Sequence, residues 1–459
     1  MIFRRKRAPS HPSGLRVGGV LIPWLACCQG LFVSGQPGSG KSHFLLSLIR
    51  QLVGRAHLVI TTTKSTDLAD VERVCRESGQ IHRLVRLGQG SPHRLDIGDA
   101  FTSALPGACI RQLAHVTNMA GEVLNNAKGS HGGERFWDNA IADCIIRSGD
   151  LCKLATGRVR LDELLAVIQA MPGTPEQFAS DAFFADTACG RMLVGAKANR
   201  RPEIDHVYVE CVEFCSRMSG IGHKAHAAIV QGAGSILSGL VAEFAPQICR
   251  GSTIDLGDLE RRKAVLVIDG RPVERHAAGK VFNFLNVAAL QMYCLVRDPS
   301  PLDVPTFLIR DEAGWILNGS HDASIQAVSR SQKLASVAAV QNMRILAAGL
   351  GGNERAKMEA EAFVSMHNHK FFFANTCMES NQLASRLCGE SPRIMLSGGG
   401  GQAEGRGFLA GALGVSTPGW HQQMMPNVQP HEFAGLGVGE CVVVANGDYR
   451  FLDLKEKRR

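Results

Sequence analysis

The eight residues from 35 to 42 have the types and spacing needed to bind nucleotide phosphates. They read Gly-Gln-Pro-Gly-Ser-Gly-Lys-Ser and match the GxxxxGK[ST] pattern in full. Glycines let backbone N–H groups turn inward around phosphate oxygens, and the helix that follows presents the positive end of its dipole. The lysine of this pattern reaches the β- and γ-phosphates, and the final hydroxyl ligates Mg²⁺. The candidate ATP-binding residues are Gly35, Gln36, Pro37, Gly38, Ser39, Gly40, Lys41 and Ser42, with Lys41 also a catalytic candidate and Ser42 a metal ligand.

Two adjacent carboxylates form the second candidate group. Asp311 and Glu312 follow the apolar run 307–309, and open α/β sheets place their chemistry at the carboxyl ends of strands. We expect Asp311 to hold the Mg²⁺ shell, as the acid of a Walker B segment does, and Glu312 to polarise the attacking water. The alternative is a strand that ends in solvated acids. The phosphate loop favours the catalytic interpretation, and the adjacent glutamate favours hydrolysis over phosphoryl transfer to a small molecule.

A third group follows about twenty residues later. Arg330 lies at the end of an expected helix, and Gln341 ends the expected strand 337–340. A polar residue at the end of the strand next to Walker B can sense the γ-phosphate. Arg330 could act as an arginine finger that completes the site of a neighbouring subunit. Taken singly, a surface salt bridge explains Arg330, and a satisfied strand-end amide explains Gln341.

The elements that must position these residues alternate along the chain. Apolar runs typical of strands occupy 31–33, 58–62, 264–268, 307–309, 337–340, 371–373 and 441–445, and helical segments at 42–52, 281–296 and 378–387 lie between them. Several of the runs are continuous rather than alternating, which is typical of parallel strands covered by helices on both faces. The alternation therefore predicts an α/β domain with a parallel sheet.

The pattern changes between residues 101 and 223, where runs typical of strands nearly vanish and helical spacing dominates. We predict residues 1–100 as the first part of the ATPase domain, 101–223 as an inserted all-α domain, and 224–459 as the second part of the ATPase domain. The first part holds a basic tail at 1–15 and Walker A at 35–42, and the last part holds Walker B at 307–312. Residues 397–405 are glycine-rich and read as a surface loop.

Composition and charge narrow the classes of protein. A hydrophobic fraction of 45% excludes wholesale disorder, and 14 scattered cysteines without a CxxC pair do not suggest a secreted disulfide scaffold. Of the net charge of +8, residues 4–7 carry +4 and residues 455–459 carry +3. Such tails can touch phosphates or anionic lipid, or simply aid solubility. No run reads as a transmembrane span.

The order of these features resembles a known family, the TraG/TraD-like conjugative coupling proteins of type IV secretion systems, in the FtsK/HerA branch of motor ATPases. The resemblance covers residues 23–453 and rests on the following features: 35–42, Thr63-Lys64-Ser65 after the second strand, 134–138 in the helical insert, 264–269, Asp311 with Glu312, Arg330, Gln341 and 437–445. It implies a RecA-like P-loop sheet, parallel with a mixed edge, and an all-α insert that recruits substrate.

The resemblance also implies a function: an ATP- and Mg²⁺-dependent motor that moves DNA, single- or double-stranded, or a DNA–relaxase complex towards a secretion channel. The expected partners are DNA, five further copies of the chain in a hexamer, a relaxase and inner-membrane components of the secretion system. The expected location is the cytoplasm. Either the chain lies at the periphery of the inner membrane with its anchor in another protein, or it is a soluble relative with another role. The alternative is a nucleotide-switched adaptor that binds a protein through its helical insert without pumping DNA.

Overall fold

The computed structural model describes residues 13–98, 100, 117, 119, 120, 135–397 and 419–454. In this part of the chain, nine strands form one sheet in the order β13-β12-β9-β3-β8-β7-β4-β6-β5. The strands are β3 (Leu31–Ser34), β4 (Leu58–Thr61), β5 (Leu84–Gly88), β6 (Val265–Asp269), β7 (Thr306–Arg310), β8 (Leu334–Val340), β9 (His369–Phe373), β12 (Glu440–Ala445) and β13 (Asp448–Asp453). All are parallel from β9 to β5, whereas β12 and β13 run antiparallel at one edge. This arrangement confirms the predicted α/β sheet with a mixed edge.

The central strands are buried along their whole length because helices cover both faces. One face packs against α2 (Lys41–Leu52) and α3 (Ser65–Glu77). The other face packs against five helices: α14 (Pro272–Val296), α15 (Gly319–Val328), α16 (Met343–Gly349), α17 (Glu354–Ser365) and α18 (Met378–Leu387). Alternate residues of β3 divide between the two cores, with Leu31 and Val33 in one and Phe32 in the other.

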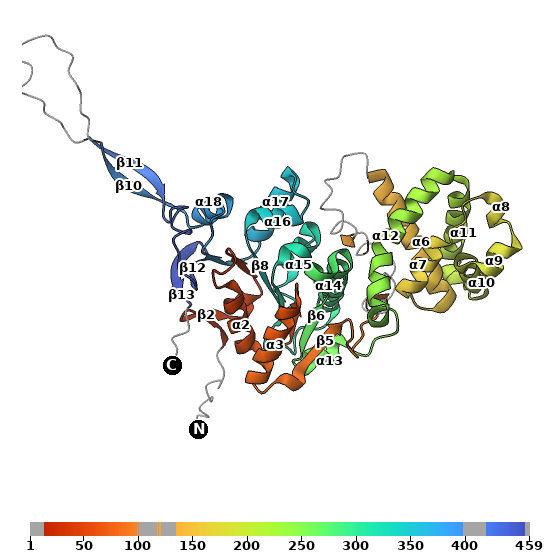
Figure 1. Ribbon diagram of the computed structural model, residues 1–459, viewed down its shortest axis with the longest axis horizontal. Coiled ribbons are helices and arrows are strands. Elements are labelled where there is room, and N and C mark those ends of the chain that lie inside the picture. The colour runs from red at the N-terminus through yellow and green to blue at the C-terminus, as the bar shows by residue number, and fades with distance from the viewer. Residues whose placement is uncertain are drawn as a thin grey trace, which may run out of the picture.

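A helical unit extends from the β5–β6 edge of the sheet (Figure 1). Its helices are α6 (Arg135–Thr156), α7 (Leu161–Gln169), α8 (Pro175–Phe178), α9 (Asp181–Asp186), α10 (Ala188–Ala198), α11 (Asp205–Gly220) and α12 (His223–Ile248), and α13 (Leu256–Arg261) leads back to β6. Residue 223, where we set the end of the insert, is the first residue of α12. Since α12 packs on α6 and α7 as well as on α14, helical packing continues past that residue.

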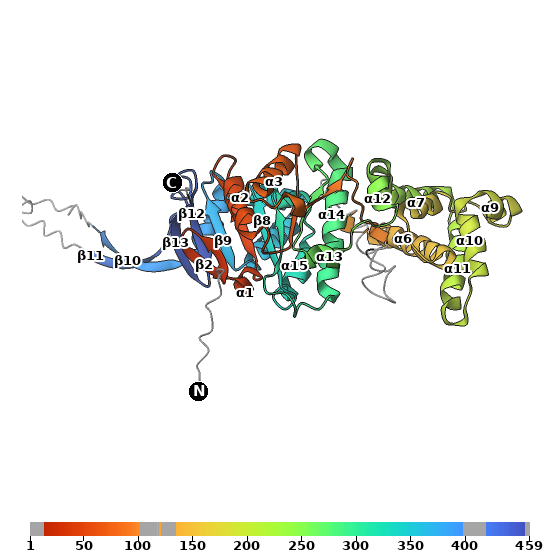
Figure 2. The same ribbon diagram turned by 90° about the horizontal axis from the view of Figure 1, so that it is seen from below.

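Two small antiparallel ribbons complete the described part of the chain. Strands β1 (Gly14–Val17) and β2 (Val20–Pro23) pack beside α1 (Trp24–Cys27). Strands β10 (Glu390–Ser397) and β11 (Gly419–Pro426) form an arm that projects from the end opposite the helical unit (Figures 1 and 2). The sequence predicted neither ribbon. The basic tails at 4–7 and 455–459, and residues 398–405 of the predicted glycine-rich loop, lie outside the described residues.

One described helix, α12, has the length and mean hydropathy of a membrane span. Its most apolar window is 39% buried, and it contacts α6, α7 and α14. A core helix meets the same criterion of length and composition, so α12 alone is weak support for a span.

Candidate functional site

The predicted phosphate loop connects β3 to α2 and adopts the conformation that its glycines allow. Gly38 and Gly40 have φ values of 79° and 104°, a region that side chains with a Cβ rarely adopt. A Cβ on Gly40 would also lie 3.0 Å from the backbone nitrogen of Gly439, which donates a 2.9 Å hydrogen bond to the Ser39 carbonyl. The segment before β12 therefore braces the loop, and only glycine fits at position 40.

Lys41 is buried and lies over this loop. Its ammonium donates to the carbonyl oxygens of Gly35 and, at 3.3 Å, of Gln36. Burial lowers the pKa of Lys41, while the nearby carboxylates of Glu312 and Asp311 act in the opposite direction. The charges of the two acids that follow β7 thus act to raise the pKa of Lys41, although 270 residues separate Lys41 from Asp311 in sequence.

The two acids follow β7, which is separated from β3 only by β8. Burial, the Glu312 carboxylate and the Asp67 carboxylate raise the pKa of Asp311 to about 6. Glu312 has left-handed backbone angles, φ 52° and ψ 49°, and its N–H donates to Asp311 Oδ1 at 3.0 Å. Non-glycine residues in this region are uncommon and cluster at functional sites.

Gln341 follows the last residue of β8. This strand lies between β3, which leads into the phosphate loop, and β7, which leads into the two acids. Its Nε2 donates a 2.9 Å hydrogen bond to Glu312 Oε1. Lys41, Asp311, Glu312 and Gln341 are therefore gathered at one edge of the sheet, where the parallel strands end.

Arg330 lies elsewhere. It is exposed and precedes β8, whereas Gln341 follows that strand. Seven extended residues span roughly 23 Å, so Arg330 is at the opposite edge of the sheet from the phosphate loop. Within one chain it does not belong to the site.

The residues present fit a magnesium nucleotide. Ser42 lies exposed in the first turn of α2, and together with Asp311 it supplies the oxygen ligands that Mg²⁺ prefers. Burial is the main cause of the raised pKa of Asp311, and the neighbouring carboxylates of Glu312 and Asp67 add negative charge that a divalent cation would offset. No cluster of three or more His, Cys, Asp or Glu side chains that could hold a metal by itself occurs among the described residues.

A cavity of about 540 Å³ opens beside the phosphate loop. Its lining includes Arg16, Gly40, His43, Gln51 and Phe373. The volume is within the range of small-molecule sites, and the cavity borders Gly40 of the phosphate loop.

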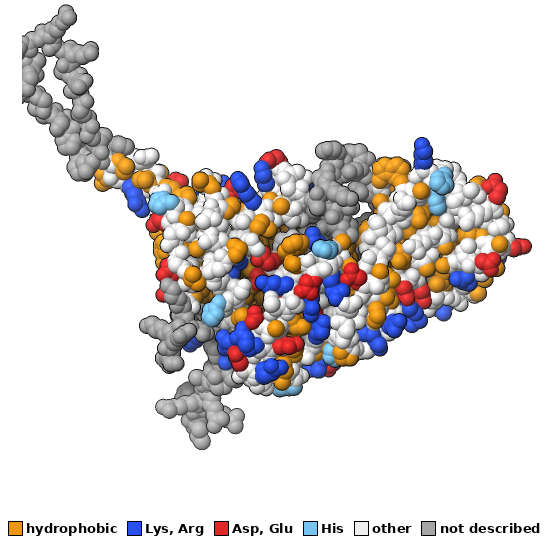
Figure 3. Space-filling view, in the orientation of Figure 1, with side chains coloured by type: hydrophobic (Ala, Val, Ile, Leu, Met, Phe, Trp, Pro, Cys, Tyr) orange, Lys and Arg blue, Asp and Glu red, His pale blue; other side chains and the backbone are white. Residues whose placement is uncertain are grey.

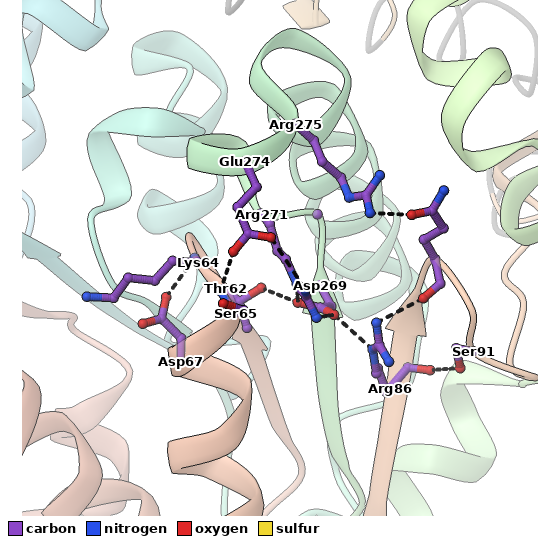
Figure 4. Close-up of polar contacts among 12 residues, drawn as sticks. Thr62, Lys64, Ser65, Asp67, Arg86, Ser91, Asp269, Arg271, Glu274 and Arg275 are labelled. Atoms are coloured by element: carbon purple, nitrogen blue, oxygen red, sulfur yellow. Dashed lines mark hydrogen bonds and ion pairs between the residues drawn. The ribbon is translucent and has the colours of Figure 1, made fainter.

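Sequence reasoning missed a second polar cluster at the same edge (Figure 4). Asp269 ends β6 and is bonded by three side chains: Thr62 at 2.8 Å, Arg86 at 2.8 Å, and Arg271 through two bonds of 2.9 and 2.8 Å. Glu274 accepts a 2.8 Å hydrogen bond from the Ser65 N–H. The position of Asp269 at the end of a predicted strand was the available signal.

The cluster joins the turn after β4 to the helical unit. Asp67, in the first turn of α3, accepts hydrogen bonds from two backbone N–H groups of the turn after β4, those of Thr63, at 2.8 Å, and Lys64, at 3.1 Å. On the other side, Arg275 forms a 3.1 Å ion pair with Glu243 of α12. Gln89 links Arg275 to the cluster, because its side-chain oxygen accepts from Arg275 and its backbone carbonyl accepts a 2.9 Å hydrogen bond from Arg86. A polar path thus leads from Asp67, whose carboxylate acts on Asp311, to Glu243 near the C-terminal end of α12.

Comparison with known proteins supports the fold. No profile of a known protein family matches the sequence, and no curated protein matches it. Among solved structures, the unbound bacterial conjugative coupling protein TrwBdeltaN70 matches with a TM-score of 0.62 and 15% identity, over 99% of this chain and 90% of that chain. TrwB in complex with ADP and Mg²⁺ matches with the same score and identity, over 99% and 91%. VirB4 of Thermoanaerobacter pseudethanolicus matches with a TM-score of 0.52 and 12% identity, over 94% and 90%.

At these identities the likeness shows the fold alone, an α/β fold of the RecA-like P-loop type. It confirms the fold that the order of motifs predicted.

Proposed function

We propose that the chain is a magnesium-dependent ATPase that moves DNA. The observation that carries the proposal is the placement of β8 between β3 and β7, which brings Gln341 and Glu312 to the edge that bears Lys41. Structures of TrwB with ADP and Mg²⁺ and with an ATP analogue support a nucleotide role for the shared fold.

In this proposal each side chain has a distinct task. The backbone of residues 35–42 cradles the phosphates, and the Lys41 ammonium leaves its two loop carbonyls to contact the β- and γ-phosphate oxygens. Ser42 and Asp311 would hold Mg²⁺, which neutralises phosphate charge when bound. Glu312 orients and polarises the attacking water, and Gln341 holds the Glu312 carboxylate through Oε1.

The motor role is supported by the likeness to a conjugative coupling protein over 99% of the chain. We propose a homo-oligomer, a hexamer, in which Arg330 of one copy reaches the phosphate loop of the next, because it does not reach the loop of its own chain. The helical unit would recruit a DNA–relaxase complex, and the assembly would work in the cytoplasm at the inner-membrane face of a type IV secretion channel.

On the face shown in Figure 3, acidic and basic side chains are intermixed across the middle of the molecule. If DNA binds inside a ring, it is contacted by several subunits at once, so a weak charge on each subunit is sufficient.

The test is ATP turnover with and without DNA. We expect single- or double-stranded DNA to raise the rate of phosphate release at low salt, and Lys41→Ala to abolish it. A rate that neither form of DNA changes, at any salt concentration, would remove the motor role and favour the alternative adaptor. The polar path from Asp67 to Glu243 of α12 is the observation that favours an adaptor whose helical unit responds to nucleotide.

A further inference from the structure

Asn375 lies at the edge that carries the phosphate loop but was not among the candidate residues. It follows β9, which pairs in parallel with β3, so both strands end at the same edge. Its exposed fraction is 4%. Its own N–H donates a 3.3 Å hydrogen bond to the carbonyl of Phe433.

Each polar atom of Asn375 has a hydrogen-bond partner, and these partners fix which way the side-chain amide points. Nδ2 donates to the backbone carbonyl of Gln341 at 2.8 Å. Oδ1 accepts from the Cys377 N–H at 2.9 Å, and the backbone carbonyl accepts from Asn381 Nδ2 at 2.8 Å. A rotated amide would set Oδ1 against a carbonyl oxygen and Nδ2 against an N–H, so the donor to Gln341 is fixed.

The bond from Asn375 spans the phosphate-loop strand. Gln341 follows β8 and Asn375 follows β9, and β3 lies between these two strands. The loop backbone is attached to both, since the Gly35 N–H donates to Val340 at 3.4 Å and the Gln36 N–H donates to Ala374 at 2.9 Å. The hydrogen bond from Asn375 to the Gln341 carbonyl thus links the residues that follow β9 and β8, the two strands on either side of β3.

We propose that Asn375 is a positioning residue that fixes the backbone of Gln341 so that Nε2 of Gln341 holds the Glu312 carboxylate. The proposal rests on the proposed ATPase function. Asn375 acts through Gln341, and its contribution belongs to hydrolysis rather than to nucleotide binding.

The first test substitutes Asn375 in the full-length chain. Asn375→Ala removes the donor, and Asn375→Asp removes it while keeping the volume and the acceptor for Cys377. We expect both to lower kcat about fivefold to tenfold, which is the effect of losing one hydrogen bond that matters in the transition state. KM for ATP should change less than about twofold, because the phosphate cradle remains.

Asn286→Ala is the matched control. Asn286 is 1% exposed, and its Nδ2 donates at 2.8 Å to a backbone carbonyl, that of Phe282, within α14. This variant should lower the melting temperature but keep kcat.

The second test separates positioning from general support of the fold. In a Gln341→Ala background, Asn375→Ala should cause no further fall in kcat, because no amide remains to be positioned. Multiplicative losses in the double variant would overturn the proposal. So would unchanged kcat in both Asn375 variants while Gln341→Ala slows hydrolysis, and this outcome would leave the ATPase function standing. A wild-type chain that hydrolyses no ATP would overturn both.

Discussion

Adjacent carboxylates at the end of β7 occupy different environments although they are neighbours in sequence. Asp311 has a raised pKa because burial, Glu312 and Asp67 all oppose its ionisation. Glu312 is turned by its left-handed backbone and held by Gln341. A left-handed residue with a Cβ costs about 1 to 2 kcal/mol, and such strain persists where the surrounding structure imposes it. The turn thus places the two carboxylates in different surroundings, as the separate roles proposed for them require: Asp311 as a Mg²⁺ ligand and Glu312 as the group that polarises water.

Because the pKa of Asp311 is raised, replacing this residue by a neutral one should stabilise the fold by an amount that depends on pH. We expect Asp311→Asn to raise the melting temperature of the nucleotide-free chain at pH 7.5, where the wild-type carboxylate is ionised against its surroundings. As the pH falls through about 6, the wild-type carboxyl takes up a proton and the gain should shrink. Thermal melts from pH 7.5 to 5 measure this, and a gain that grows towards acid would contradict it. The same variant should weaken Mg²⁺-dependent ATP binding at pH 7.5.

Among single residues, those that belong to a contiguous motif were predictable from the sequence. Residues whose importance depends on contacts with distant parts of the chain were not. Residues 35–42 and the pair Asp311–Glu312 are recognisable from spacing alone. Asn375 and Asp67 are common polar residues whose importance lies in bonds to Gln341 and to the turn after β4. Those bonds depend on which strands are neighbours, and spacing does not contain that information.

At the scale of elements, the ends of β4, β5 and β6 are tied together through Asp269. The carboxylate is fully buried, while its partners Arg86 and Arg271 are 32% and 19% exposed. Burial alone would raise the pKa of Asp269, but the hydrogen bonds from Arg271 and Thr62, with the charges of Arg271 and Arg86, lower it. The ionised form therefore stabilises the fold.

Asp269→Asn should lower the free energy of unfolding by about 2 to 3 kcal/mol at pH 7.5, since two arginines lose their common partner. A lowered folded-state pKa means that this stabilisation is present above the ordinary carboxyl pKa and is lost as the pH falls through the folded value. Urea unfolding at pH 7.5, and at pH values below the ordinary carboxyl pKa of about 4, should therefore show a difference between variant and wild type that shrinks only below that pKa.

The exposed pair of Asp70 with Arg73 provides the control. Both side chains are about half exposed, so Asp70→Asn should cost less than about 0.5 kcal/mol. If Asp269→Asn and Asp70→Asn lower the free energy of unfolding by the same amount, the buried Asp269 carboxylate does not stabilise the fold as proposed.

Most strands of the sheet were predictable because they are continuous apolar runs. Strand β5 was missed because Arg86 interrupts it, and that arginine is satisfied by Asp269 of the next strand. Strands β1 and β2 are only four residues each around Gly18 and Gly19. The β10–β11 arm pairs with itself, and sequence alternation without a covering layer is a weak signal.

At the scale of the whole molecule, the order of strands decides what one chain can do alone. The placement of β8 between β3 and β7 assembles the site, and the same strand carries Arg330 to the opposite edge. Pairing between strands that are distant in sequence fixes this order. The local sequence pattern could therefore suggest Arg330 and Gln341 as candidates, but not that they lie at opposite edges of the sheet.

Mixing two inactive variants tests whether Arg330 serves a neighbouring copy. Arg330→Ala and Lys41→Ala should each be inactive, and an equal mixture should regain turnover. Random assortment leaves roughly one quarter of the interfaces with an intact loop and an intact arginine, as a head-to-tail ring requires. Phosphate release by the mixture, compared with each variant alone, measures this.

Arg261→Ala serves as the matched arginine control, because that side chain is 73% exposed and lies outside the site. It should keep full activity alone. A mixture of Arg330→Ala and Lys41→Ala that stays as inactive as its components would argue against a shared site.

The role of Glu312 in polarising the attacking water is tested by the rate of phosphate release by Glu312→Gln at saturating ATP and Mg²⁺, together with its Kd for ATP. The exchange keeps the size of the side chain but removes the carboxylate that would polarise water. We predict a fall in rate of at least about 100-fold, the usual contribution of a general base, with Kd nearly unchanged. A variant that releases phosphate at the wild-type rate would contradict it.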